Sequence, residues 1–188
     1  AFIDVSMLDC QIAILENAIA RYLSKNEIPG PMGSRHPSIA PFEAFKTKDS
    51  YIIIAAGNDK LFAKLCEVLK IPKTTNDERF NSNSLRCENM DQLKEIFEKQ
   101  LRSKSTNEWV KEMEALKIPC GPIFNIKQAV ENPQIQERNM IVKSYHKIIG
   151  EFKSAGNPIK MSTYKDENTR GNIPDLDEHR EKIIKEFS

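Results

Sequence analysis

Residues 51–72 have the sequence YIIIAAGNDKLFAKLCEVLKIP, in which the residue pattern changes at the glycine. Tyr51 to Ala56 are mostly β-branched or apolar residues, a composition typical of a strand, and Gly57 ends the run. Asn58 is a favourable N-cap, and apolar residues then recur at helical spacing until Pro72. The stretch therefore predicts a short strand followed by an amphipathic helix.

Two further amphipathic helices are predicted downstream of this strand and helix. The first covers about 91–101 and the second runs from about 106 to 117. Ser105 and Glu108 stand three positions apart, which is the spacing of a capping box at a helix start. Residues 118–123, punctuated by two prolines and a glycine, predict an extended segment. Together these elements indicate an α+β fold built on one compact core.

The longest apolar repeat lies near the N-terminal end. From Val5 to Leu23 apolar residues recur every three or four positions, and Asp4 or Ser6 can cap the exposed N–H groups. One long helix is predicted there. Its other faces also carry apolar residues, more than a surface helix needs, so we expect a large partner to cover it.

The C-terminal third predicts shorter elements. Asn125 can cap a short helix, and strands are predicted at 140–145 and 156–161 around a turn at Gly150. A helix at 178–187 closes the chain. Like the first helix, this last one has an apolar face for which the chain offers little cover.

Composition and charge limit the kinds of partner. The 28 Lys+Arg nearly balance the 27 Asp+Glu, so nothing points to nucleic acid or an acidic membrane as a partner. No apolar stretch reaches the length of a membrane span, and the four cysteines lack the spacing of a disulfide framework or a zinc site. We expect a cytoplasmic protein, or a mitochondrial matrix protein in a eukaryote. The start, which has neither methionine nor a basic leader, is interpreted as a cut in a longer protein.

A search for self-contained catalytic motifs finds none. The sequence has no P-loop, no dinucleotide-binding glycine pattern, no nucleophile elbow and no zinc-binding helix motif. Cys120 is interpreted as a small buried residue, because the sequence places no base or cation beside it. His146 and His179 stand alone and are interpreted as structural or solvent-facing.

Residues 29–37, PGPMGSRHP, form a predicted loop that holds a possible anion-binding pair. Its prolines and glycines exclude a helix or an inner strand. Arg35 can contact both oxygens of a carboxylate, or a phosphate, and His36 can donate beside it. The pair has a second interpretation, as a structural hydrogen-bonding pair in a linker between domains.

Several segments, taken in order, resemble the family III CoA-transferases over nearly the whole chain. They are DVSMLD at 4–9, GSRHPSIAPF at 33–42, AAGND at 55–59, DERF at 77–80, IPCGPI at 118–123, NPQ at 132–134 and IPDLDEH at 173–179. Asp177 stands where the family usually has glycine. The sequence at 33–42 resembles in particular that of the succinyl-CoA:glutarate branch, which acts on dicarboxylates. This resemblance implies that Arg35 pairs with a free carboxylate.

The resemblance implies that this chain is the C-terminal part of a two-domain enzyme. In the family, the N-terminal half and the extreme C-terminus form a Rossmann-like large domain, and two chains interlock as a homodimer. The following segments are then expected: a large-domain helix at 1–26, a linker at 27–40, a small α+β domain at 41–162, and a linker with a returning helix at 163–188. This organisation would account for the uncovered apolar faces of the terminal helices.

The resemblance also implies a mechanism. An aspartate carboxylate attacks the acyl-CoA thioester, and CoA passes through an aspartyl-CoA thioester to the acceptor acid. That aspartate lies upstream of the match, so neither Asp4 nor Asp9 takes its role and no catalytic residue is assigned here. Met7, Arg35 and His36 are carried over as substrate-binding residues. Acyl-CoA and a carboxylic acid are the implied substrates, with no cofactor and no metal.

Two other functions stay open at this point. One is an acyl-CoA racemase of the same superfamily, which transfers a proton at the α-carbon and whose acid and base would also lie upstream. The other is a non-catalytic fragment that complements an N-terminal partner, as the uncovered helix faces suggest.

Overall fold

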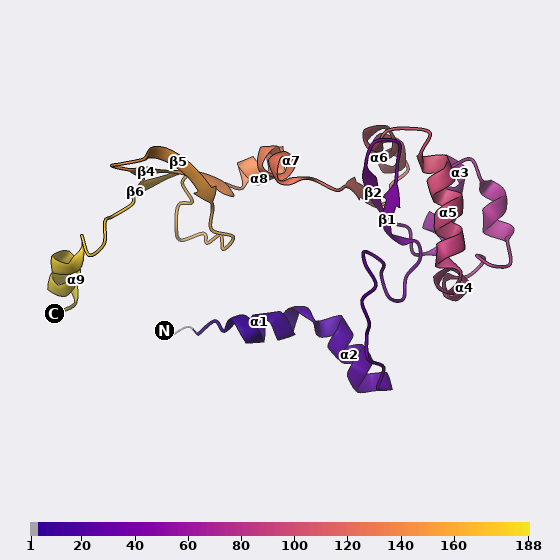
Figure 1. The fold of residues 1–188 in the computed structure, drawn as a ribbon, viewed down its shortest axis with the longest axis horizontal. Coiled ribbons are helices and arrows are strands. Elements are labelled where there is room, and N and C mark those ends of the chain that lie inside the picture. Colours follow the sequence, from indigo (N-terminus) through magenta and orange to yellow (C-terminus); the bar gives the residue numbers. More distant parts are fainter. Residues whose placement is uncertain (1–3) are drawn as a thin grey trace. The chain divides into compact units, whose positions relative to one another are not determined.

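A computed structural model describes residues 4–188, and the chain divides into two compact units, Ala1–Ile123 and Phe124–Ser188 (Figure 1). The first three residues, on which the interpretation of the start depends, lie outside the described part. The predicted boundaries after residues 26, 40 and 162 refer to a complete two-domain enzyme. They stay a prediction.

The first unit contains a three-stranded antiparallel sheet with the order β1-β2-β3. Its strands are β1 (Phe42–Lys46), β2 (Tyr51–Ala55) and β3 (Cys120–Pro122). Phe45 pairs with Ile52, and Ile53 pairs with Gly121. The strand at 51–56 and the extended segment at 118–123 are thereby confirmed. Strand β1 was not predicted, because its five residues include Glu43 and Lys46, types that are rare in strands.

Five short helices accompany this sheet. They are α3 (Asp59–Val68), the 3₁₀ helix η1 (Pro72–Asn76), α4 (Asn83–Glu88), α5 (Met90–Leu101) and α6 (Thr106–Ala115). The side chain of Asn58 accepts the N–H of Leu61 at 2.9 Å, which confirms the predicted cap of α3. The capping box of Ser105 and Glu108 is formed at the start of α6. Helix α4 is too short to show a helical apolar period, and it was missed.

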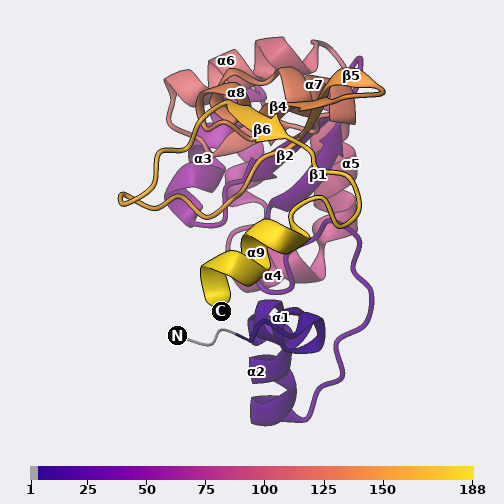
Figure 2. The same ribbon diagram turned by 90° about the vertical axis from the view of Figure 1, so that its left-hand side faces the viewer.

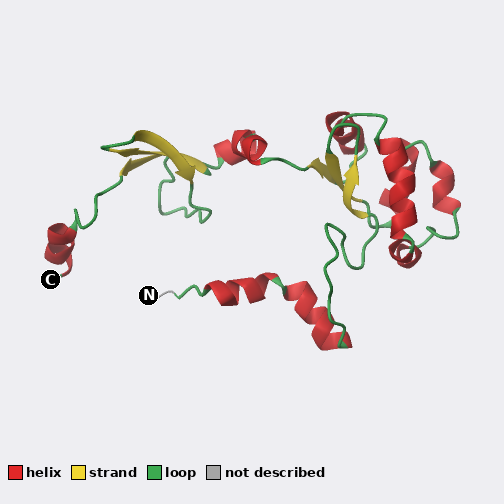
Figure 3. Ribbon diagram, in the orientation of Figure 1, coloured by secondary structure: helices red, strands yellow, loops and turns green. Residues whose placement is uncertain are grey.

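The core of this unit lies between the sheet and helices α3, α5 and α6, which gather around the strands in Figure 2. Its large, fully buried members are Phe45, Ile52, Ile54, Leu65, Leu69, Phe80, Met90, Leu93, Phe97, Leu101 and Met113. The buried indole of Trp109 donates to the Leu101 carbonyl at 2.7 Å, so its polar atom is satisfied. The α+β fold class is confirmed, with helices and small sheets in one chain (Figure 3).

The predicted single helix at 5–23 is wrong in its continuity. The structure has two helices, α1 (Met7–Ile14) and α2 (Glu16–Lys25), and Ser6 caps the first of them. At Leu15 the N–H bonds to the Ile12 carbonyl, three residues back, so the last turn tightens and α1 ends. Neither helix has a buried residue.

The second unit combines short helices with a mixed sheet of order β5-β4-β6. Its elements are α7 (Ile126–Glu131), α8 (Pro133–Glu137), β4 (Ile141–His146), β5 (Gly150–Ala155), β6 (Thr169–Asn172) and α9 (Arg180–Phe187). Strand β4 pairs antiparallel with β5 and parallel with β6. Val142 and Ser144 are the buried residues of the unit, so it has almost no core of its own.

The strand predicted at 156–161 is wrong in position. Strand β5 starts at Gly150, where φ is 76°, and its pairing with β4 ends where Ala155 faces Ile141. Gly156 then passes so close to the residues before β4 that a Cβ there would lie 2.1 Å from the Asn139 carbonyl oxygen. The chain leaves the sheet at this point. Among residues 4–188, no helix is long and apolar enough to cross a membrane.

The capping box of α6 supports a stability prediction. Replacing Ser105 with alanine removes the side chain that receives the Glu108 N–H, and we expect the free energy of unfolding to fall by about 1 kcal/mol. Urea denaturation of the protein measures it. The control is Ser50→Ala, an exposed serine in a turn. Equal midpoints for both variants would show that the cap adds nothing.

Candidate functional site

The loop between α2 and β1 is the part of the chain from which the site is built. Residues 27–41 contain no helix or strand, as their prolines and glycines predict. Gly33 has a φ of 64°, a conformation that favours glycine, and it lies in a turn closed by the N–H of Arg35 and the Met32 carbonyl. The turn directs the loop back along β1.

Backbone and side-chain bonds fasten this loop to β1. The Ala44 N–H donates to the hydroxyl of Ser34 at 3.1 Å, and the His36 N–H donates to the Phe42 carbonyl at 2.9 Å. The His36 ring stacks on Phe42 with 5.2 Å between ring centroids, and its Nδ1 accepts the N–H of Ser38. These contacts fit the structural interpretation of His36. Its role in substrate binding stays a prediction.

Helix α4 holds the end of the loop. Asn83 donates to the Ser38 carbonyl at 2.8 Å and accepts the Ala40 N–H at 3.0 Å. The buried Arg86 donates to the Ala40 carbonyl at 2.9 Å. Both polar groups of the Ala40 backbone are therefore bound by side chains of one short helix.

Arg35 lines a cavity of about 560 Å³. The other charged residues of its lining are Glu43 from β1 and Asp91 and Lys94 from α5, and residues 31–34 of the loop complete it. The cavity therefore contains two cations and two carboxylates. Of the three residues predicted to bind substrate, Arg35 lines this cavity, whereas His36 and Met7 do not.

The four charged side chains form one network. Arg35 Nη2 donates to Asp91, and Arg35 Nε lies 3.4 Å from Glu43 Oε1. Lys94 Nζ donates to Glu43 Oε2 and also to the Ala44 carbonyl at 2.9 Å. Burial alone would lower the pKa of Arg35, but the hydrogen bond and charge of Asp91, with the charge of Glu43, outweigh it and raise that pKa. Arg35 therefore stays a cation.

The network suits the binding of an anion. Arg35 has five N–H donors in a planar fork that matches a carboxylate, and its side chain keeps 30% of its surface exposed. Within residues 4–188 no group of three or more His, Cys, Asp and Glu side chains is placed to hold a metal ion. The arrangement can position a carboxylate or phosphate, and it includes no residue arranged as a nucleophile with its base.

The sequence did not identify Glu43, Asp91 or Lys94 as site residues. Glu43 carried a signal: it alternates with Phe45 on the buried face of β1, where a charge needs partners. The sequence gives no signal that Asp91 and Lys94 belong to a site, because an acidic residue in a first helical turn followed by a lysine is ordinary on exposed helices.

Met7 lies apart from these contacts. It is the first residue of α1, and its side chain is 86% exposed. Its assignment as a substrate-binding residue stays a prediction.

Cys120 does not have the surroundings of a nucleophile. Its thiol is half-buried, and burial raises its pKa, as does the charge of Glu114. Cys120 was interpreted as a small buried residue, and the structure has it half-buried and packed against the core.

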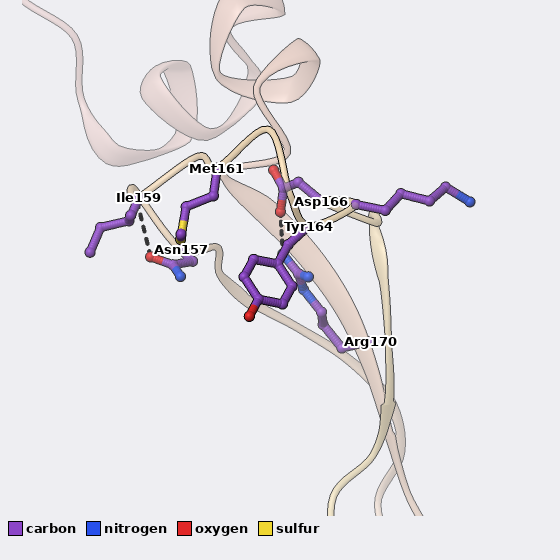
Figure 4. Close-up of a pocket in the computed structure, with 7 residues that line it drawn as sticks. Asn157, Ile159, Met161, Tyr164, Asp166 and Arg170 are labelled. Carbon is purple, nitrogen blue, oxygen red and sulfur yellow. Dashed lines mark hydrogen bonds and ion pairs between the residues drawn. The ribbon is translucent and has the colours of Figure 1, made fainter. Parts of the chain in front are cut away.

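The second unit has a smaller cavity of about 140 Å³ beside β6 (Figure 4). Asp166 accepts hydrogen bonds from Lys160 at 2.5 Å and from Arg170 at 2.6 Å, and these bonds lower its pKa. Tyr164 and Met161 line the same cavity. This cavity is smaller than the one at Arg35, which has a volume of about 560 Å³.

Comparison with known proteins supports a family assignment. The sequence profile of CoA-transferase family III matches residues 1–180. An acetyl-CoA:oxalate CoA-transferase of Acetobacter aceti is 37% identical over 188 residues, which is all of this chain and 47% of the relative. A human succinyl-CoA:glutarate CoA-transferase is 32% identical over 185 residues, covering 98% of this chain and 42% of the relative.

The fold matches solved structures of the same kind. A CAIB/BAIF family protein from Brucella suis has a TM-score of 0.76 and 31% sequence identity, over 99% of this chain and 48% of the other. The chain thus spans about half the length of the relatives it matches. From the profile match, the identities and the shared fold, we conclude that the chain belongs to CoA-transferase family III.

Proposed function

We propose that the complete protein transfers CoA from an acyl-CoA to a carboxylic acid, and that this chain is its C-terminal part. The observation that carries the proposal is the family match over residues 1–180, together with relatives named as CoA-transferases. The names of these relatives contain oxalate and glutarate, which are both dicarboxylates. We therefore propose a dicarboxylate acceptor.

The cavity at Arg35 supports this acceptor class. A dicarboxylate that receives CoA on one carboxyl group keeps the other as an anion. Arg35 lines a cavity open to such a group and presents a guanidinium fork that fits it. Arg35 is thus proposed to hold the carboxylate that does not react, and Lys94 lies in the same lining.

The reaction needs a nucleophile that we place outside residues 1–188. An aspartate carboxylate attacks the thioester carbonyl, which gives a mixed anhydride and releases the CoA thiolate. The thiolate attacks the aspartyl carbonyl, which releases the donor acid and leaves an aspartyl-CoA thioester. The acceptor carboxylate then attacks this thioester, and the thiolate finally takes the acceptor acyl group from the second anhydride. No cofactor takes part, and electrons and protons balance within the two substrates.

Exposed apolar residues support the proposal that a further part of the protein covers this chain. On α1 and α2, Leu8 is 70% exposed, Ile14 74% and Leu23 76%. On α9 Phe187 is 80% exposed, and in the second unit Leu176 is fully exposed. Surfaces this apolar are usually buried against a partner. We propose that the large domain and a second chain of a homodimer cover them, in a cytoplasmic enzyme.

An assay of the complete protein tests the proposed function. With succinyl-CoA as donor and glutarate or oxalate as acceptor, we expect the acceptor's CoA thioester to form. A complete protein that interconverts the two epimers of a 2-methylacyl-CoA, and transfers no CoA, would be the racemase alternative instead. The relatives named above are transferases, so no observation favours the racemase.

The isolated chain supplies a separate prediction. We expect residues 1–188 alone to transfer no CoA, because the proposed nucleophile is absent from them. The same chain mixed with the separately produced N-terminal part should regain turnover. Measurable transfer by the purified chain alone would show that the nucleophile has been placed wrongly.

A further inference from the structure

The two carboxylates of the Arg35 cavity differ in burial, and this difference matters if the proposed function holds. The side chain of Glu43 is 4% exposed and that of Asp91 is 87% exposed. Both contact Arg35. One is thus part of the interior, and the other lies at the solvent edge of the cavity.

Glu43 is fixed in place. Its Oε2 accepts from Lys94, and Lys94 is held in turn by the Ala44 carbonyl at 2.9 Å. Its buried Oε1 has no hydrogen-bond partner among the described residues and faces Arg35 Nε at 3.4 Å. A buried carboxylate that lost these cations would be strongly destabilised, so Glu43 does not exchange its partners.

Asp91 is held far less firmly. It lies in the first turn of α5, and its described contact is the ion pair with Arg35 Nη2. Because water can solvate an exposed carboxylate, an ion pair of this kind contributes little free energy. Another carboxylate can therefore replace Asp91 at the guanidinium at small cost.

We propose that Asp91 is an exchangeable counter-ion of Arg35, which the carboxylate of the bound substrate displaces. Glu43 keeps Arg35 and Lys94 in position while Asp91 moves into solvent. Of the three N–H donors of Lys94, two are used by Glu43 and Ala44. The third has no hydrogen-bond acceptor among the described residues, although Nζ also lies 5.5 Å from the centroid of the Phe45 ring, and it can bind the same incoming anion. Asp91 thereby sets how tightly a dicarboxylate binds.

The substitution Asp91→Asn tests this role. A neutral amide competes less for the guanidinium, so we expect the KM for the dicarboxylate acceptor to fall about fivefold, with kcat unchanged. Asparagine keeps the size of the side chain, and position 91 is exposed, so the fold is retained. A KM that is unchanged or higher would overturn the proposal, because Asp91 would then be either irrelevant or a support of Arg35.

Glu95→Gln is the matched control. Glu95 is exposed, lies one helical turn further along α5, and does not line the Arg35 cavity. The variant makes the same change in net charge on the same helix. If it lowers the KM as much as Asp91→Asn, the effect is a general gain of positive charge, and the proposal is wrong.

A double-mutant cycle shows whether Asp91 acts through Arg35. In an Arg35→Ala background we expect Asp91→Asn to leave the KM unchanged, because the guanidinium that Asp91 occupies is gone. A fivefold fall that persists in this background would contradict the proposed exchange.

Direct binding separates this inference from the proposed function. Isothermal titration of glutarate and of oxalate into the complete protein measures affinity without turnover. If the wild-type protein transfers no CoA but Asp91→Asn still tightens binding about fivefold, the proposed function fails and the counter-ion role stands. If CoA transfer occurs and neither dicarboxylate binds more tightly to the variant, the counter-ion role fails alone.

Discussion

Replacing Arg86 with methionine lowers the free energy of unfolding by about 3–5 kcal/mol, a larger loss than the one expected at the Ser105 cap. Arg86 is 1% exposed and donates to the carbonyls of Ala40 at 2.9 Å and Phe80 at 3.1 Å. Both carbonyls belong to buried residues, so each loses its partner where water does not replace it. The cation also stacks on Phe62, 4.5 Å from the ring centroid.

The ion pair of Arg86 with Asp59 contributes less to this loss. The two side chains are 2.7 Å apart, but Asp59 is 76% exposed and can be solvated after the substitution. Arg86→Lys should therefore also destabilise, since a single ammonium does not reach both carbonyls and the carboxylate in the geometry of a guanidinium. The loss of stability therefore arises mainly from the two backbone carbonyl groups that no longer have a hydrogen-bond donor.

Urea denaturation, monitored by circular dichroism, measures the effect of Arg86→Met on the free energy of unfolding. Arg102→Met is the control, because that side chain is 60% exposed and its ion pair with Glu98 is 3.8 Å long. We expect the control to change stability by less than about 0.5 kcal/mol. If Arg86→Met unfolds at the same urea concentration as the control, the buried hydrogen bonds are not what stabilises α4 against the start of β1.

If the proposed function holds, we expect Arg35→Ala in the complete protein to raise the KM for the dicarboxylate acceptor by about 10- to 100-fold, the expected value for losing hydrogen bonds to a charged group. The KM for acetyl-CoA as donor should change little, because its acyl group has no free carboxylate, whereas the KM for succinyl-CoA should rise as well. The KM for a monocarboxylate acceptor should change little, since that acceptor has no second carboxylate for Arg35 to hold. Steady-state kinetics of the complete protein with both acceptor types measures this difference.

Two comparisons make the Arg35 result specific. Arg35→Lys keeps the charge but loses the planar fork, so part of the affinity should return. Arg102→Ala removes a cation outside the Arg35 cavity and should leave both KM values unchanged. An acceptor KM that stays the same in Arg35→Ala would remove Arg35 from the substrate site.

Local signals in the sequence were accurate where a few neighbouring residues determine the structure. The cap at Asn58, the capping box of Ser105 and Glu108, and strand β2 were all predicted and are all present. Each depends on residues within a few positions of one another, because capping bonds and strand alternation are short-range. The segments from 4–9 to 173–179 also led to the family that the profile match confirms.

Errors occurred where the local pattern did not mark a boundary. Leu15 is in register with the apolar repeat, yet the helix is interrupted there. The segment 156–161 has strand-forming residues, but the sheet partner ends at Ile141, opposite Ala155. In both cases the periodicity shows which residues are apolar. It does not show where the backbone hydrogen bonds of the helix or of the sheet end.

The amino-acid sequence alone was enough for the α+β class, the family and Arg35 as a candidate anion ligand, because these depend on local patterns and on segment order. The tertiary structure was needed to bring Glu43, Asp91 and Lys94 to Arg35. The Arg35–Asp91 contact spans 56 positions and the Lys94–Glu43 contact spans 51. Contacts at such separations form only when β1, α5 and the loop pack together. The periodicity of a short stretch of sequence does not predict them.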